Sequence, residues 1–429
     1  MAKVEIFSQE SKKFKLTRLS AAIAIPDGDP VIENNAFVGH TELTSIKIPY
    51  SVTAIGENAF RGCSGLISVE IPESVVSIGE GAFRGCRGLT SLTIPNSIRS
   101  IQDFTFYDCS GLLSISIPPS VVSIGIRAFD GCSGLKEVSL PLYLFHLSDF
   151  CFYDCRSLSA ITIPYSVVTL GISVFKGCQA LTSVCIPDSV TSIGDNSFYG
   201  CSELTSIVIP PSVVYLGGGA FNGCSQLESV SLPPSLAAIG NDTFRGCVRL
   251  HSIDIPPSTR SIGFAAFHSC SRIASMHIPD SVTVIKSNAF EHCRGLLSLQ
   301  LPASLRYISV YSFQSCRSLR ALEIPRSVSA IDSAAFKGCC DLTSLVLPDS
   351  VTSLCSESFS GCRGLVHITA PNQFLQQKYF PHTPPAALAS PVPPPPAASR
   401  VRQVTDCSRL PSVRPSVLRP FMRGDNIHQ

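Results

Sequence analysis

Residues 66–88 read LISVEIPESVVSIGEGAFRGCRG, and this stretch decides the fold because the chain repeats its pattern every 23 residues. Proline marks the register, since it recurs at this period from Pro26 to Pro371 without an insertion or a deletion. Phenylalanine keeps the same step from Phe37 to Phe359, and cysteine keeps it from Cys63 to Cys362. Such a period predicts a solenoid, in which stacked units bury a core that no single unit could bury alone.

Each unit divides into three parts by its hydrophobic pattern. The segment LISVEI ends in an alternation of apolar and polar residues, which is typical of a half-buried strand, and the proline after it ends that strand. The next segment, SVVSIG, is expected to be extended, with a turn at its glycine. The last segment, AFRGC, is long enough for only one or two helical turns, so we expect a short helical return there.

The repeated pattern L-x-x-V-x-I-P-x-S-V-x-x-I-G-x-x-A-F-x-G-C resembles the leucine-rich repeats of the BspA-like type over about four-fifths of the chain. The resemblance implies an α/β solenoid, a leucine-rich repeat horseshoe of about 15 coils. It places a parallel β-sheet on the concave side and short helical or 3-10 turns on the convex side. It also implies a binding protein without catalytic activity, because members of this family include bacterial and protist surface antigens implicated in adhesion.

The chain is expected to have four parts. The solenoid spans 26–371, between an N-terminal cap at 1–25 and a C-terminal cap at 372–380, because the open strand edges of a stack need covering. Residues 381–429 are predicted to form a Pro/Arg-rich disordered tail. Its four prolines at 393–396 could bind an SH3- or WW-type groove, but no basic residue stands at the usual flanking distance.

Charge and hydropathy exclude several kinds of partner. Charged residues make up 15% of the chain and the formal net charge is +2, so no polybasic field for nucleic acid is expected. Proline and glycine interrupt every repeat, so no membrane span is predicted. The N-terminal stretch does not resemble a secretory signal, which favours a cytoplasmic or nuclear protein. The family resemblance makes a cell-surface location the alternative.

The 19 cysteines are mostly explained by the repeat. Equivalent positions on neighbouring coils lie about 5 Å apart with their Cβ atoms in parallel, whereas a disulfide needs Cβ atoms about 3.8 Å apart. A ladder of small, buried, reduced cysteines accounts for the column from Cys63 to Cys362 without oxidation. Such a thiol-rich core fits a reducing compartment.

No catalytic residue and no cofactor are predicted. The nine histidines scatter over the columns, with no Ser-His-Asp or Glu-x-x-His arrangement among them. A zinc site is conceivable where His268 and Cys270 meet His292 and Cys293 on the adjacent coil. However, both cysteines belong to the buried column, and His292 lies one column later than His268. The sequence therefore favours no metal site, and a zinc-dependent enzyme is the third and least favoured hypothesis.

The outward side of the predicted strands is the remaining candidate for a functional surface. Side chains that flank the strand valine point outward, one column being nearly uniform serine and the other varied. The varied column includes Lys47, Glu70, Asp254, His277, Gln300 and Glu323. We expect these residues to form part of a protein-binding surface on the concave face, which would make the chain an interaction scaffold. A solvated sheet without a partner is the alternative, and the sequence does not identify the partner.

Overall fold

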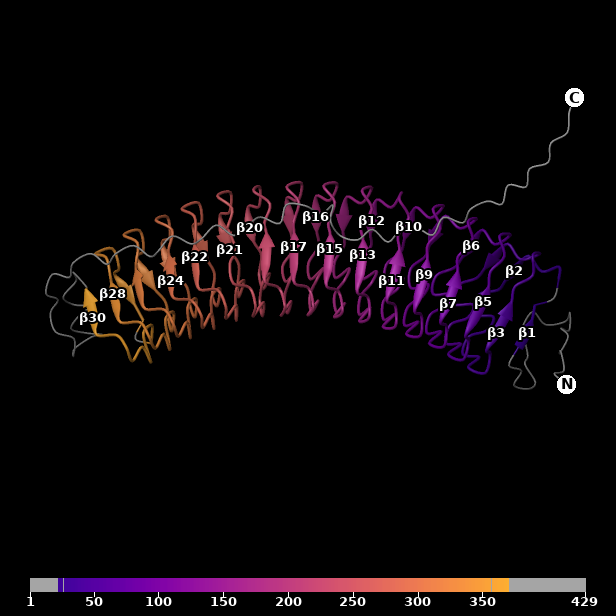
Figure 1. Cartoon of the computed structure of the whole chain (residues 1–429), viewed down its shortest axis with the longest axis horizontal. Coiled ribbons are helices and arrows are strands. Elements are labelled where there is room, and N and C mark those ends of the chain that lie inside the picture. Colours follow the sequence, from indigo (N-terminus) through magenta and orange to yellow (C-terminus); the bar gives the residue numbers. More distant parts are fainter. Residues whose placement is uncertain (1–21, 26, 356, 370–429) are drawn as a thin grey trace, which may run out of the picture. The chain divides into compact units, whose positions relative to one another are not determined.

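The computed structural model describes residues 22–25, 27–355 and 357–369, which lie within one compact unit. They form a parallel β-solenoid of about 14 turns. The turns stack side by side in the order of the sequence, from β1 to β30 (Figure 1). The predicted tail, the C-terminal cap and most of the N-terminal cap lie outside the described residues.

Most turns carry a three-residue strand followed by a two-residue strand. The three-residue strands are β1 (Ala22–Ala24), β3 (Ser45–Lys47), β5 (Ser68–Glu70), β7 (Ser91–Thr93), β9 (Ser114–Ser116), β11 (Glu137–Ser139), β13 (Ala160–Thr162), β15 (Ser183–Cys185), β17 (Ser206–Val208), β19 (Ser229–Ser231), β22 (Ser275–His277), β24 (Ser298–Gln300), β26 (Ala321–Glu323), β28 (Ser344–Val346) and β30 (His367–Thr369). The two-residue strands are β2 (Val31–Ile32), β4 (Ala54–Ile55), β6 (Ser77–Ile78), β8 (Ser100–Ile101), β10 (Ser123–Ile124), β12 (His146–Leu147), β14 (Thr169–Leu170), β16 (Ser192–Ile193), β18 (Tyr215–Leu216), β20 (Ala238–Ile239), β21 (Ser261–Ile262), β23 (Val284–Ile285), β25 (Tyr307–Ile308), β27 (Ala330–Ile331) and β29 (Ser353–Leu354).

Strands of neighbouring turns pair in parallel, each residue with the one 23 positions later, as Ser45 does with Ser68. The ladder of three-residue strands is continuous from β1 to β11 and then continues as shorter sheets. At Ser252 only an isolated parallel bridge to Ser229 is formed, so the expected strand is missing from that turn. The parallel sheet predicted from the repeat is confirmed, because a constant 23-residue step keeps the same residue types opposite each other.

The core is built from columns that run through the stack. The phenylalanine rings from Phe37 to Phe359 stack face to face, with centroids 5.1 to 5.8 Å apart on neighbouring turns. Leu66, Val75 and Ile78 are buried around the ring of their turn. Every turn adds the same apolar set to its neighbour, so the core is thin in cross-section and continuous along the solenoid.

The return segment after each two-residue strand is not helical, which corrects the prediction of helical or 3-10 turns on the convex side. Among the described residues, alternate N–H groups of the segment donate hydrogen bonds to the next turn, as Phe60 N–H does to Ala82 O at 2.8 Å. The N–H between two such donors, as at Arg61, bonds three residues back, to Asn58 O at 3.1 Å. Left-handed residues such as Asn58 (φ 51) and Gly62 (φ 74) interrupt any helical run. The backbone groups that a helix would satisfy internally therefore hold adjacent turns together.

The cysteine column has a hydrogen-bonding role as well as a packing role. Cys86 Sγ donates to Phe60 O at 3.1 Å, and Cys247 Sγ donates to Phe221 O at 3.2 Å, in each case one turn back. The column cysteines from Cys63 to Cys339 are all buried, so the predicted ladder of small buried cysteines is confirmed. The accepting carbonyl also takes the N–H of the cysteine on its own turn, as Phe60 O does from Cys63 at 3.1 Å, so each buried thiol finds a backbone partner.

Candidate functional site

The strand face is the outward side of the three-residue strands, and it carries all six residues that the sequence selected. Lys47, Glu70, Asp254, His277, Gln300 and Glu323 are each exposed. Five of them end a three-residue strand, but Asp254 lies outside any strand, in the turn where only the Ser252 bridge forms. The alternation exposed–buried–exposed along β5 and β22 shows why: the middle residue faces the core and its neighbours face solvent.

The six residues form two separate groups on the strand face. Lys47 and Glu70 are opposite each other in the β3–β5 ladder, with charges of opposite sign. Asp254, His277, Gln300 and Glu323 follow one another on four successive turns several turns away. Within this second group, which we call the acidic-end cluster, His277 Nδ1 lies 3.1 Å from Gln300 Oε1. The chemistry of the face therefore changes along the solenoid while its backbone geometry repeats.

Exposed apolar side chains gather on the loops that follow two strand-ending prolines, a feature that the sequence prediction missed. Leu142 and Tyr165 occupy the same column on adjacent turns and are 71% and 83% exposed. Tyr143 and Phe145 lie beside them and are also exposed. The signal was present in the sequence, because most of the equivalent positions on other turns hold polar residues or proline. Aromatic side chains of this kind are enriched in protein–protein interfaces.

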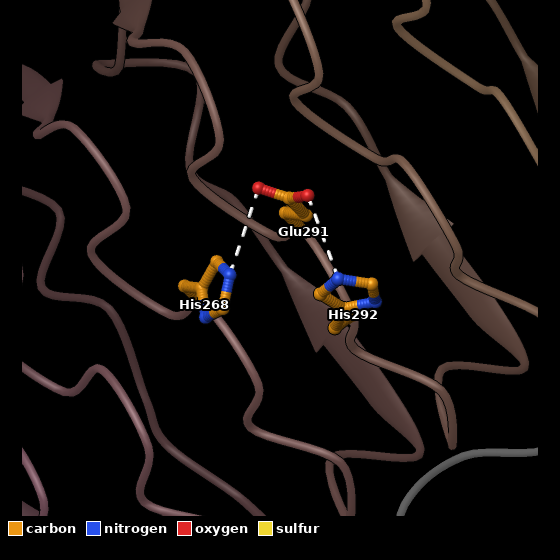
Figure 2. Close-up of side chains that lie close together, drawn as sticks. All are labelled: His268, Glu291 and His292. Carbon is orange, nitrogen blue, oxygen red and sulfur yellow. Dashed lines mark ion pairs between the residues drawn. The ribbon is translucent and has the colours of Figure 1, made fainter.

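A second cluster lies on the return segments after β21 and β23 and joins His268, Glu291 and His292 (Figure 2). Both imidazoles turn a nitrogen toward the carboxylate: His268 Nε2 is 3.6 Å from Oε2, and His292 Nε2 is 3.5 Å from Oε1. The two imidazole rings stand nearly perpendicular, with centroids 5.4 Å apart. One donor atom from each residue lies within 4.8 Å of the others, and within the described part of the chain this is the one such group.

Neighbouring polar groups hold this cluster in place. Gln314 Nε2, one turn further on, donates to Glu291 Oε1 at 2.8 Å, and the Asn288 side-chain amide donates to Oε2. Ser269 Oγ lies 2.9 Å from His268 Nδ1, which leaves Nε2 of that ring to face the carboxylate. Burial lowers the pKa of His268, partly opposed by the nearby Glu291 carboxylate. Burial therefore favours the neutral form of the His268 imidazole, which is the form that can bind a metal ion.

The structure revises which residues meet at this place. Cys270 and Cys293, the other candidate ligands, are buried and donate to Phe244 O and Phe267 O, each at 3.1 Å. Glu291 was not selected from the sequence, although it stands 23 residues after His268 and so occupies the same column on the next turn. The 23-residue register was sufficient to find it.

Comparison with known proteins gives a consistent result. The family model of the BspA type leucine rich repeat region (6 copies) matches residues 30–148, 145–274 and 260–383. A leucine-rich repeat protein from Bacteroides ovatus, of known crystal structure, is 30% identical with a TM-score of 0.65, over 83% of this chain and 89% of that chain. A leucine rich cell surface protein from Faecalibacterium prausnitzii is 27% identical with a TM-score of 0.49, over 79% of this chain and 90% of that chain. None of the curated proteins matches the chain.

The described part of the chain contains no helix long and apolar enough to cross a membrane.

Proposed function

Because the chain belongs to the family of BspA-type leucine-rich repeat proteins, we propose that it is a non-catalytic scaffold that binds another protein through its strand face. The observation that carries this proposal is the difference between the two outward columns of side chains on that face. One outward column is nearly uniform serine, and the other changes its chemistry from turn to turn on the same backbone frame. A constant column supplies a flat surface, and a varied column supplies specificity.

The strand face is suited to binding because its geometry is fixed before a partner arrives. The ladder hydrogen bonds and the stacked phenylalanines hold every turn at one spacing, so little backbone entropy is lost on association. The serine side chains are short, which lets a partner approach the sheet closely. The acidic-end cluster then presents Asp254 and Glu323 as charges that complement a basic surface.

The proposed location is the cytoplasm or the nucleus, with the cell surface as the alternative. Support for the first comes from the free cysteines, including the exposed Cys340 and Cys355, which a reducing compartment would keep as thiols. A cell-surface adhesion protein of the same family would use the same face, so the proposal that the strand face binds a partner does not depend on the location. A C-terminal proline-rich ligand for SH3 or WW domains stays a separate prediction about the tail.

The proposal is tested by affinity capture with the full chain and with the double variant Asp254→Lys, Glu323→Lys. We expect the variant to lose captured partner by about tenfold or more, because a reversed charge pair repels the surface that the native pair attracts. The matched control is Glu57→Lys, Glu80→Lys, which reverses two exposed carboxylates beside the return segments. The control should capture the same partner at the native level.

Two outcomes contradict the proposal in different ways. Equal capture by the strand-face variant and the native chain removes the acidic-end cluster from the interface. Loss of the partner in Tyr165→Ser but not in the strand-face variant would move the interface to the exposed apolar loops around Leu142 and Phe145. Circular dichroism of every variant checks that the solenoid is intact.

A further inference from the structure

We propose that His268, Glu291 and His292 bind a divalent transition metal ion, with zinc as the best match to their donor set. Two imidazole nitrogens and one carboxylate oxygen are a common ligand set for zinc sites that keep a further position open. The proposal is independent of the strand-face function, because the three residues lie on the return segments and not on the strands.

The spacing of the donor atoms is close to that of a bound zinc ion. Zinc holds nitrogen and oxygen ligands at about 2.0–2.2 Å, so two ligands in a tetrahedral arrangement lie about 3.3 Å from each other. In the structure, His268 Nε2 is 3.6 Å from Glu291 Oε2 and His292 Nε2 is 3.5 Å from Glu291 Oε1, and one donor atom from each residue lies within 4.8 Å of the other two. All three donors already converge from two adjacent turns (Figure 2), so small side-chain rotations complete the site.

The backbone that carries the cluster is rigid. Ser269 N–H donates to Glu291 O at 2.8 Å, which ties the two turns together beside the site. His292 N–H donates in turn to Gln314 O at 2.8 Å. The hydrogen bonds to Glu291 from Gln314 and Asn288, and that between Ser269 and His268, act as outer contacts that orient ligands. These contacts orient two of the three ligands before any metal arrives.

His292 is not explained by its role in the fold. It adopts a left-handed backbone conformation (φ 61) at the column where Gly246, Gly338 and most other turns carry glycine. Its Nδ1 is buried without a hydrogen-bond partner, and its Nε2 is 3.5 Å from Glu291 Oε1, too far for a strong hydrogen bond. A residue that is unfavourable for the backbone is expected where its side chain has a function, and His292 Nε2, which makes no strong hydrogen bond, is available to bind a metal ion.

Exposure leaves room for the ion and for one more ligand. The side chains of His268 and His292 are 20% and 32% exposed, while that of Glu291 is 12% exposed. The ion would therefore sit at the surface, with the carboxylate beneath it. Three protein ligands leave the fourth position of a tetrahedral zinc to water or to a side chain of a bound partner.

The test is calorimetric titration of zinc into the metal-free full chain, compared across single variants. The informative variant is His292→Gly, because it removes a ligand and supplies the residue that this column carries on most turns. We expect this variant to fold at least as stably as the native chain and to bind zinc about 100-fold more weakly. Glu291→Gln keeps the shape of the carboxylate and should also lose about 100-fold.

The controls separate this site from other donors. Ser315→Gly makes the equivalent backbone change one turn later (φ 59) without removing a ligand, and His277→Ala removes an exposed imidazole of the strand face. Both should bind zinc as the native chain does. With cobalt as the probe, the bound ion should show no thiolate charge-transfer absorption.

Three results would overturn the proposal. Unchanged zinc affinity in His292→Gly rules out that ligand, and a thiolate absorption with cobalt assigns the binding to cysteines such as Cys340 or Cys355. If the native chain binds no zinc, the cluster is a polar contact within the return segments and not a metal site. Variants of Glu291 would then change stability alone.

Discussion

At the scale of single residues, the return segments hold buried polar groups whose surroundings are unusual for them. Asp130 is 4% exposed, and its carboxylate accepts a hydrogen bond from Arg127 Nη1 at 2.5 Å. The guanidinium of Arg127 in turn lies 4.1 Å from the centre of the Phe150 ring. Burial raises the pKa of Asp130 to about 6, against the opposing effect of Arg127. The folded state therefore prefers the protonated acid.

This preference predicts a pH-dependent effect of Asp130→Asn. The unfolded carboxyl has a pKa near 3.8 and the folded one has a pKa of about 6. The stability that comes from the protonated form is thus complete below about pH 4 and is lost as the pH rises through about 6. At pH 8 the asparagine variant should be more stable than the native chain by up to about 3 kcal/mol. Urea denaturation at pH 8 and pH 4 measures this, and a variant that is less stable at pH 8 contradicts it.

At the scale of the element, the return segment is shaped by its left-handed residues. Each turn places two of them four residues apart, such as Asn196 (φ 56) and Gly200 (φ 71). Glycine meets this demand without cost, and asparagine, aspartate and serine meet it at moderate cost. The second of these positions is glycine on most turns but Ser269, His292 and Ser315 on three successive ones. The stretch that holds the proposed metal site therefore lacks glycine at this position on three turns in a row.

A pair of substitutions tests this account of the return segment. Gly200→Ala should destabilise the solenoid by about 1 kcal/mol or more, because alanine is strained at this backbone conformation. A Cβ there would meet no atom closer than 3.9 Å, so steric crowding is not the cause. Ser315→Gly should stabilise the solenoid or leave its stability unchanged. Thermal unfolding followed by circular dichroism measures both, and an equal effect of the two changes would refute the argument.

At the scale of the whole molecule, the packing of successive turns depends on the protonated state of the buried cysteine column. Burial raises the pKa of Cys63 to about 11 and that of Cys293 to about 12, and it raises those of other buried column thiols such as Cys247. The thiols are therefore protonated at physiological pH and inert toward oxidants and alkylating reagents. The same hydrogen bond from cysteine to phenylalanine recurs throughout, so one ionised thiol disturbs the contact between two turns.

Two consequences follow for the behaviour of the folded chain in alkali. The stabilisation from protonated thiols is complete below about pH 9, the ordinary value, and is lost as the pH rises through about 11 to 12. Stability should therefore fall steeply in that range. At pH 8, a thiol reagent should react rapidly with exposed cysteines such as Cys340 and Cys355 and with the column only in denaturant. Equal rates for all cysteines at pH 8 would contradict the buried ladder.

The sequence by itself determined the features that depend only on the period. A constant step of 23 residues places equal residue types on adjacent turns, so the parallel register, the phenylalanine stack and the buried cysteine column could all be predicted. The alternation of side chains along a strand also sufficed to predict that Lys47 and Glu323 are exposed. These predictions need only the knowledge of which residues lie next to each other on adjacent turns and along a strand, and the 23-residue period gives this directly.

Only the tertiary structure decided which acceptors the backbone N–H groups of the return segment bond to and which of its side chains meet. The pattern A-F-x-G-C is compatible with a short helix, but its N–H groups bond to the next turn because left-handed residues prevent the helical path. The meeting of His268 and His292 at Glu291 depends on an offset of one residue between columns. Periodicity relates His268 to Glu291, which occupy the same column on adjacent turns, but it does not relate them to His292, which stands one position further on. Its geometry is set by the path of the backbone and the rotation of three side chains, which no column of the sequence encodes.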